Sequence, residues 1–184
     1  DITYNGHRGT DYFLWPFAWN KMDDEDIEVV AAAAGMIIGK EDGNQDHNCT
    51  LVNTPWNAVY IRHADDSVAW YGHLKQGSVL TKSIGDTVMQ GEYLGLVGSS
   101  GMSTGPHLHF ELWQDESNTQ LIDPYAGSCN ALNVNSWWAA QRPYYDSAIN
   151  KLTTGTAPVA FLECGPFDLT YEKDTIEPGD QTYL

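Results

Sequence analysis

The sequence has few basic residues and no long apolar run. Nine Lys and Arg stand against 25 Asp and Glu, which gives a formal net charge of −16. A nucleic-acid surface needs clustered cations, and these are scattered singly, so nucleic acid is excluded as a partner. The most apolar run, residues 29–38, is far shorter than the ~20 residues of a membrane-spanning helix. The sequence therefore predicts no membrane span. Because 184 residues suffice for one core, we expect a single domain, and we expect it to be a monomer.

The three cysteines, Cys49, Cys129 and Cys164, lack the Cys-x-x-Cys spacing that is typical of structural zinc. A zinc site made by His47 and these cysteines is therefore weakly supported. Three buried thiols are another interpretation, but we favour one disulfide and an oxidising compartment. We predict that Cys129 is joined to Cys164, because this bridge ties down the C-terminal part. The chain starts at Asp1 without Met, so we expect any targeting peptide to have been removed or to lie outside this sequence.

Two-residue alternation of apolar and polar residues dominates the middle of the chain. Turns rich in Gly and Asp separate the runs, which predicts a mainly β fold with an antiparallel sheet. The alternating runs are residues 58–63, 68–74, 91–97 and 107–113. Residues 41–55 are polar and predict a long loop. The loop starts like a calcium-binding loop at Asp42, Asn44 and Asp46, but His47 replaces the required Gly, so we interpret it as solvated.

The alternating pattern of the sequence ends by residue 124. The aromatic-rich stretch 136–149 predicts a short helix, which Pro143 interrupts. We interpret residues 1–125 as the core domain. Residues 126–184 are expected to be a C-terminal extension that packs on this core and does not form an independent domain.

The most informative feature of the sequence is a His-x-His pair. Side chains alternate along a strand, so His107, His109 and Glu111 are expected on one face, opposite an apolar face. Two imidazoles on one face can bind a single metal ion, or one can bind metal while the other reaches a substrate. Two ordinary surface histidines remain an alternative interpretation of such a pair.

Two further patches carry histidine. His7 and Asp11 lie in a Gly-rich segment, and a nitrogen and a carboxylate suit zinc, although the pair by itself also fits a surface loop. Alternation predicts that Tyr71 and His73 share one face, and His73 is either a site residue or a core histidine. We expect a structural role for His63, because it ends an apolar strand.

Together these patches resemble the lysostaphin-type zinc metallopeptidases, which include the beta-lytic and LytM-like enzymes that cut peptidoglycan. The resemblance is carried by His-x-x-x-Asp at 7–11, by the sequence YGHL at 71–74 and by GSSGMSTGPHLHFEL at 98–112. The sequence GDTV at 85–88 is similar to a hairpin of the same family. The resemblance covers residues 7–124 and implies an antiparallel β scaffold with a substrate groove. Residues 13–27 and the loop that ends at Pro55 are expected to line this groove.

The resemblance implies a role for each polar residue of these patches. His7, Asp11 and His109 would hold Zn²⁺, and His73 and His107 would be catalytic histidines beside it. Three protein ligands leave a fourth position for water, which is typical of catalytic zinc. A metal-bound water would be the nucleophile. His73 or His107 would accept its proton, because the chain has no His-Glu-x-x-His motif with a glutamate base.

We therefore predict a zinc metalloendopeptidase that is secreted or resides in the cell envelope. Its substrate would be a peptidoglycan cross-link or a Gly-rich peptide. Two alternatives remain: a secreted protease of Gly-rich matrix proteins, and a module that binds cell-wall peptides without cutting them. A lipoyl or biotinyl carrier is excluded, because no acceptor Lys occurs between Lys82 and Lys151.

Overall fold

The computed structural model of the chain describes residues 6–127, 133–142, 154–155, 157, 164–165 and 172–173. Most of the regular structure is β, as predicted. The elements are β1 Thr10–Phe13, α1 Ala18–Asp23, β2 Glu28–Val30, β3 Gly35–Glu41, β4 Ala58–Arg62, β5 Val68–Gly72, β6 Thr87–Val88, β7 Tyr93–Leu96, β8 His107–Trp113, β9 Leu121–Ile122, β10 Thr154–Gly155 and β11 Glu172–Lys173.

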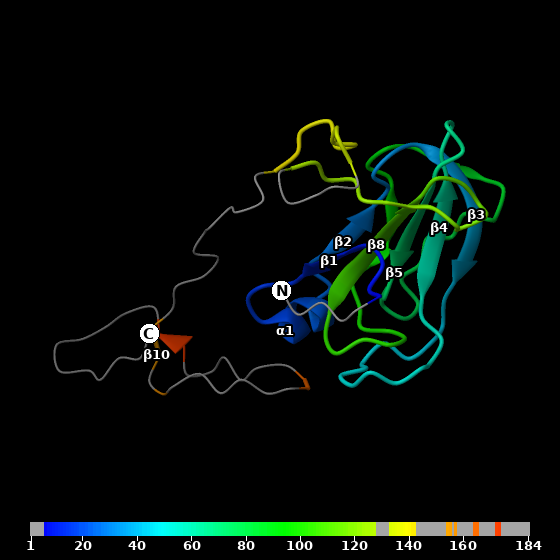
Figure 1. Cartoon of the computed structure of the whole chain (residues 1–184). Coiled ribbons are helices and arrows are strands. Elements are labelled where there is room, and N and C mark those ends of the chain that lie inside the picture. The colour runs from blue at the N-terminus through cyan, green and yellow to red at the C-terminus, as the bar shows by residue number, and fades with distance from the viewer. Residues whose placement is uncertain are drawn as a thin grey trace.

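The main sheet has seven strands in the order β1-β8-β5-β4-β3-β6, and β9 also pairs with β8. All its pairings are antiparallel, and β8, β5, β4 and β3 lie side by side in Figure 1. The predicted antiparallel sheet is therefore confirmed. The run at 91–97 contains β7, but this strand pairs with β2 in a separate two-stranded sheet.

Alternation along the central strands separates a core face from a site face. Val59, Ile61, Tyr71, Phe110 and Leu112 belong to the hydrophobic core cluster. The residues between them, including Tyr60 and Trp70 and the histidines of β8, project to the opposite face, because side chains alternate along a strand. This face carries the candidate site.

The alternation ends at His73, and here one prediction is wrong. Tyr71 and Leu74 both belong to the core, whereas His73 lies against His107 and His109. His73 has a φ of 60°, in the left-handed region that non-glycine residues rarely adopt. This backbone conformation turns the His73 side chain away from the face of Tyr71 and toward the site.

The segment after β9 begins by packing on the core. The ring of Trp138 lies 5.9 Å from that of Phe110 and 5.7 Å from that of Tyr125, measured between centroids. Residues 137–140 form bends and a turn, so the helix predicted at 136–149 is wrong over residues 136–142, and its remainder lies outside the described residues. The helix α1 at Ala18–Asp23 was not predicted. No helix among the described residues is long and apolar enough to cross a membrane.

One disulfide joins Cys49 to Cys164. The prediction of a disulfide is confirmed, but the predicted pairing of Cys164 with Cys129 is wrong. Proximity of two cysteines is decided by the folded chain, and these two are 115 positions apart in the sequence. The zinc site of His47 and three cysteines is also wrong, because a disulfide sulfur is no thiolate ligand. Cys129 itself lies outside the described residues.

Candidate active site

The pairing of β1 with β8 brings the three predicted metal ligands together. Asp11 is the direct partner of His109 in the register of the two strands. Asp11 Oδ1 lies 2.8 Å from His109 Nδ1, and Asp11 Oδ2 lies 3.1 Å from His7 Nε2. One ligand atom from each of the three residues lies within 4.8 Å of the others. Two nitrogens and one carboxylate oxygen form a donor set that suits zinc.

His73 and His107 lie directly beside this group. Their ring centroids are 4.5 Å apart, and His107 Nε2 is 3.6 Å from Asp11 Oδ1. His73 Nδ1 lies 2.6 Å from the carbonyl oxygen of Ser100, and His107 Nδ1 lies 2.7 Å from that of Gly105. A carbonyl only accepts, so each Nδ1 carries the hydrogen and a neutral ring has a free lone pair on Nε2.

Electrostatics separates these two histidines from His109. Burial lowers the pKa of His73 to about 3, and it also lowers the pKa of His107, so both rings are neutral near pH 7. Burial alone would lower the pKa of His109 as well, but its hydrogen bonds with Asp11 and Glu111 raise that pKa to about 9. Burial raises the pKa of Asp11, yet the hydrogen bond with His109 and the nearby imidazoles lower it overall. The site therefore combines two neutral bases with an ion pair.

Glu111 is bonded directly to His109, one of the three predicted metal ligands. Its Oε1 lies 2.9 Å from His109 Nε2, and its Oε2 accepts a 2.7 Å hydrogen bond from Trp113 Nε1. Alternation placed Glu111 on the face of the two histidines. The spacing gave no sign that its carboxylate would turn back along the strand to His109.

The ring of Trp56 borders the site, although no pattern in the sequence indicated a role for it. Its centroid is 5.2 Å from that of His73 and 6.0 Å from that of His109. A Cβ at Gly72 would lie only 2.1 Å from Trp56 Cζ3, and one at Gly101 would lie 2.6 Å from Trp56 Cβ. These two glycines therefore create the space that the indole occupies.

The last residue of β1 also contributes an aromatic ring. Phe13 stacks on His107 with a centroid distance of 4.9 Å, and Trp15 is largely exposed two residues later. This agrees with the expectation that residues following Asp11 line the site. His63 is not part of it, because its Nδ1 is hydrogen-bonded to the carbonyl of Ala34 at 2.9 Å, which is the structural role predicted.

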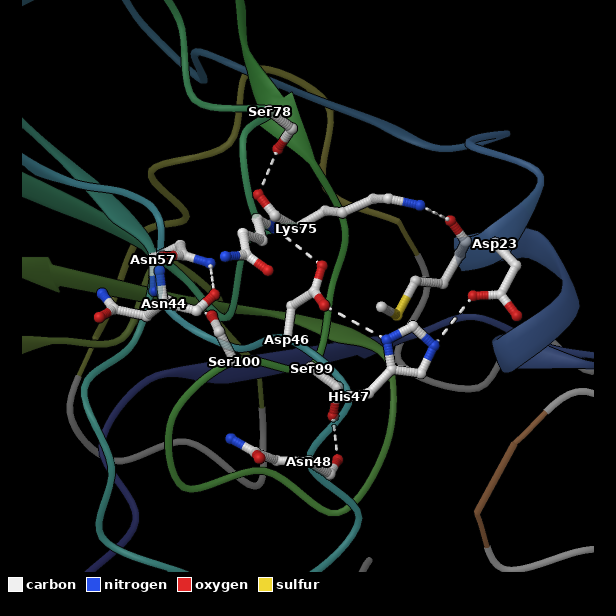
Figure 2. Close-up of polar contacts among 12 residues, drawn as sticks. Asp23, Asn44, Asp46, His47, Asn48, Asn57, Lys75, Ser78, Ser99 and Ser100 are labelled. Carbon is white, nitrogen blue, oxygen red and sulfur yellow. Dashed lines mark hydrogen bonds and ion pairs between the residues drawn. The ribbon is translucent and has the colours of Figure 1, made fainter.

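A polar network fixes the long loop near the site. Figure 2 shows the ring of His47 between Asp46 and Asp23, at 3.2 and 3.0 Å. The other oxygen of Asp46 accepts a hydrogen bond from the backbone N–H of Gln76, and Asp42 accepts one from Gly77. The carboxylates that imitate a calcium loop are thus bonded to a neighbouring turn.

The same network reaches the turn that orients His73. Ser99 Oγ donates to the carbonyl of Asn48, and Ser100 Oγ donates to that of Leu74 at 2.9 Å (Figure 2 labels both serines). Ser100 Oγ also accepts from the backbone N–H of Asn57. The Ser100 carbonyl that holds His73 is therefore fixed by two neighbouring segments.

Several curated proteins resemble this chain over its site-bearing part. The peptidoglycan DD-endopeptidase ShyC of Vibrio cholerae is 35% identical over 105 residues, which are 57% of this chain and 19% of ShyC. The DD-carboxypeptidase/endopeptidase Mpg of Neisseria meningitidis is 51% identical over 68 residues, 37% of this chain and 14% of Mpg. The glycyl-glycine endopeptidase ALE-1 of Staphylococcus capitis is 43% identical over 121 residues, which cover 60% of this chain and 32% of ALE-1. This chain thus spans less than a third of each relative.

Solved structures of similar proteins include two catalytic domains. That of lysostaphin from Staphylococcus simulans has a TM-score of 0.47 at 27% identity, covering 67% of this chain and 81% of that one. That of EnpA, a prophage-encoded M23 protein from Enterococcus faecalis, has a TM-score of 0.46 at 32% identity, with coverage of 69% and 84%. Residues 6–124 match Peptidase family M23, a range that contains all five predicted site residues. The chain therefore belongs to peptidase family M23, in agreement with the resemblance found in its sequence.

Proposed function

We propose that this chain is a zinc endopeptidase that hydrolyses peptide cross-links of peptidoglycan or other Gly-rich peptides. The observation that carries the proposal is the convergence of His7, Asp11 and His109 within one M23 domain. The names of the relatives support the substrate class, since ShyC is a peptidoglycan endopeptidase and ALE-1 a glycyl-glycine endopeptidase.

His7, Asp11 and His109 would hold the metal ion. Their two nitrogens and one oxygen suit zinc, and three protein ligands leave one position for water. Bound zinc would supply Lewis acidity, which polarises the scissile carbonyl and acidifies water. A second group of three, His73, His107 and His109, also lies within 4.8 Å. We favour the first group, because its carboxylate partly neutralises the charge of a divalent cation. Three neutral imidazoles would leave that charge uncompensated.

His73 and His107 would perform the proton transfers. Both rings are neutral and present Nε2 to the site, so either can accept the proton of an attacking water. The imidazolium formed in this way can then donate to the oxyanion or to the leaving amine. The presence of both histidines and all three ligands argues for an enzyme over a module that only binds cell-wall peptides.

The disulfide supports a location outside the reducing cytoplasm, either secreted or in the cell envelope. We also propose that residues 1–125 form the catalytic core and that the following extension packs on it. The contacts of Trp138 with Phe110 and Tyr125 support this arrangement. A monomeric state remains a prediction from the sequence.

The experiment is a digestion by protein loaded with one equivalent of zinc. Pentaglycine and purified peptidoglycan are incubated separately with the protein and with the Asp11→Ala variant, and the new amino termini are identified. We expect new amino termini with the first protein alone. If the zinc-loaded protein cleaves neither substrate, the endopeptidase proposal is wrong and the binding module is favoured.

A further inference from the structure

We propose that Glu111 is a positioning residue of the metal centre, which orients the ring of His109 and supports the segment that carries His7 and Asp11. This inference rests on the proposed function, because it assumes that these three residues bind zinc. Glu111 itself would not touch the ion. Its role would be to set which ring nitrogen of His109 faces the other two ligands.

The hydrogen bonds of Glu111 define the orientation of His109. The Glu111 residue is only 6% exposed, and its two oxygens bond to different partners, His109 Nε2 at 2.9 Å and Trp113 Nε1 at 2.7 Å. A carboxylate accepts hydrogen bonds, so Nε2 of His109 must carry the hydrogen. The lone pair available for a metal is then on Nδ1, the nitrogen that lies 2.8 Å from Asp11.

Trp113 in turn fixes the carboxylate. Its indole N–H can only donate, and the Trp113 residue is 3% exposed, so this bond is shielded from water. The guanidinium of Arg8 lies 5.6 Å from the centroid of the Trp113 ring. Arg8 directly follows the proposed ligand His7. Trp113 therefore contacts the segment that carries His7 and Asp11 as well as the carboxylate of Glu111.

Gly9 brings that segment into direct contact with Glu111. A Cβ at Gly9 would lie 2.3 Å from the carbonyl oxygen of Phe110 and 2.9 Å from Glu111 Cγ. Gly9 also has a φ of +90°, which glycine adopts without strain. The turn between His7 and Asp11 therefore rests on the backbone of β8 and on the stem of Glu111. One side chain thus contacts both parts of the ligand set.

Charge gives a second reason for the arrangement. Two carboxylates, Asp11 and Glu111, flank the imidazole of His109. A buried carboxylate is costly unless a positive charge lies nearby. A divalent cation bound by His109 would offset the negative charge of both carboxylates. Removing the charge of Glu111 should therefore weaken zinc binding.

The test measures zinc affinity by competition with a chromophoric chelator, which does not depend on activity. Glu111→Leu removes both acceptors with little change in volume, and we expect zinc affinity to fall about 10- to 100-fold. Glu111→Gln keeps one carbonyl for His109 but turns an NH₂ group toward Trp113 Nε1, so we expect a smaller loss. Trp113→Phe removes the indole N–H that supports the carboxylate and keeps an aromatic ring, so it should also cause a smaller loss. The control is Glu116→Gln, which removes an exposed carboxylate paired with Arg62, and its affinity should be unchanged.

A second measurement reports the tautomer directly. In the zinc-loaded protein, ¹⁵N NMR should show the His109 hydrogen on Nε2, and Glu111→Leu should shift this resonance. If Glu111→Leu fails to fold, judged by circular dichroism, Glu111→Gln and Trp113→Phe decide the matter.

Two outcomes would contradict different proposals. If the unaltered protein binds zinc and the folded Glu111 variants bind it equally tightly, the positioning role is wrong and the proposed function stands. If the unaltered protein binds no zinc, the proposed function is wrong and the inference falls with it.

Discussion

His73 and His107 bond to the backbone through the same ring atom. Each Nδ1 lies within 2.7 Å of a carbonyl oxygen, that of Ser100 for His73 and that of Gly105 for His107. Each neutral ring therefore directs an unprotonated Nε2 into the site. The two rings come from different parts of the sheet, one from the turn after β5 and one from the start of β8. Their common orientation leads to the first prediction.

Replacing His73 or His107 with Ala should lower turnover about 100-fold or more, because an acid-base or oxyanion group is lost. Neither residue belongs to the proposed ligand set, so both variants should retain about one zinc per chain. Activity assays and metal analysis on the same samples check this. A variant with near-normal turnover, or one that loses zinc together with activity, would contradict the assigned role.

Replacing Asp11 or His109 with Ala should remove most of the bound zinc, because each supplies one of the three proposed ligand atoms. Metal analysis after dialysis against zinc-free buffer is the measurement. His63→Ala is the matched control, since its ring bonds to the carbonyl of Ala34 outside the site. Full retention of zinc by the Asp11 variant would show that the ligand assignment is wrong.

Zinc binding should release protons. In the metal-free protein, burial opposes the charged form of His109, but the carboxylates of Asp11 and Glu111 raise its pKa to about 9. The ring is therefore protonated at pH 7.5 and must lose the Nδ1 hydrogen to bind metal. Calorimetry in two buffers of different ionisation enthalpy should show release of at least about one proton per zinc. Equal heats in both buffers would refute this.

The same pKa shift predicts the stability of the metal-free protein. Because the pKa of His109 is raised in the folded protein, its protonation stabilises the fold. This contribution is complete below about pH 6.5, the pKa of histidine in the unfolded chain. This contribution is lost as the pH rises through about 9. Urea unfolding of the metal-free protein should therefore show stability that declines between these two values, and His109→Gln should reduce the decline.

The disulfide predicts a change in stability. Cys49→Ser should lower the free energy of unfolding by about 2 to 4 kcal/mol, because the bridge closes a long loop in the unfolded chain. Peptide mapping by mass spectrometry should recover Cys49 linked to Cys164. Recovery of Cys129 linked to either residue would contradict the pairing.

Trp56 predicts substrate selectivity. Its indole lies beside His73 and His109, so we expect it to disfavour bulky side chains near the scissile bond. The unaltered protein should cleave pentaglycine at least about 10-fold faster than a peptide containing Phe-Leu, and Trp56→Ala should reduce this ratio. Trp137→Ala, which alters an exposed indole after β9, is the control. Equal rates on both peptides before mutation would exclude a narrow groove.

The sequence predicted those parts of the molecule that depend on local periodicity. Alternation located the strands of Tyr60, Trp70 and His109, and it placed His107, His109 and Glu111 on one face. The position of His73 could not follow from alternation, because a left-handed φ interrupts it. Family resemblance, rather than periodicity, joined His7 and Asp11 to the site.

The remaining features depend on contacts between distant segments. The fit of Trp56 against Gly72 and Gly101 and the pairing of Cys49 with Cys164 each involve residues far apart in the sequence. Such contacts leave no local pattern, because each partner taken alone is compatible with many environments. The bond of Glu111 to His109 is short in sequence but depends on side-chain rotamers, which periodicity does not specify.

The place of β1 at the end of the main sheet has a consequence for how the protein would retain its ion. Asp11 and His109 face each other across the pairing of β1 with β8. An ion held by both side chains would fasten the terminal strand to its neighbour in addition to the backbone hydrogen bonds. Separation of this strand would then disassemble the ligand set, so the residence time of the ion would be governed by how often the strand opens.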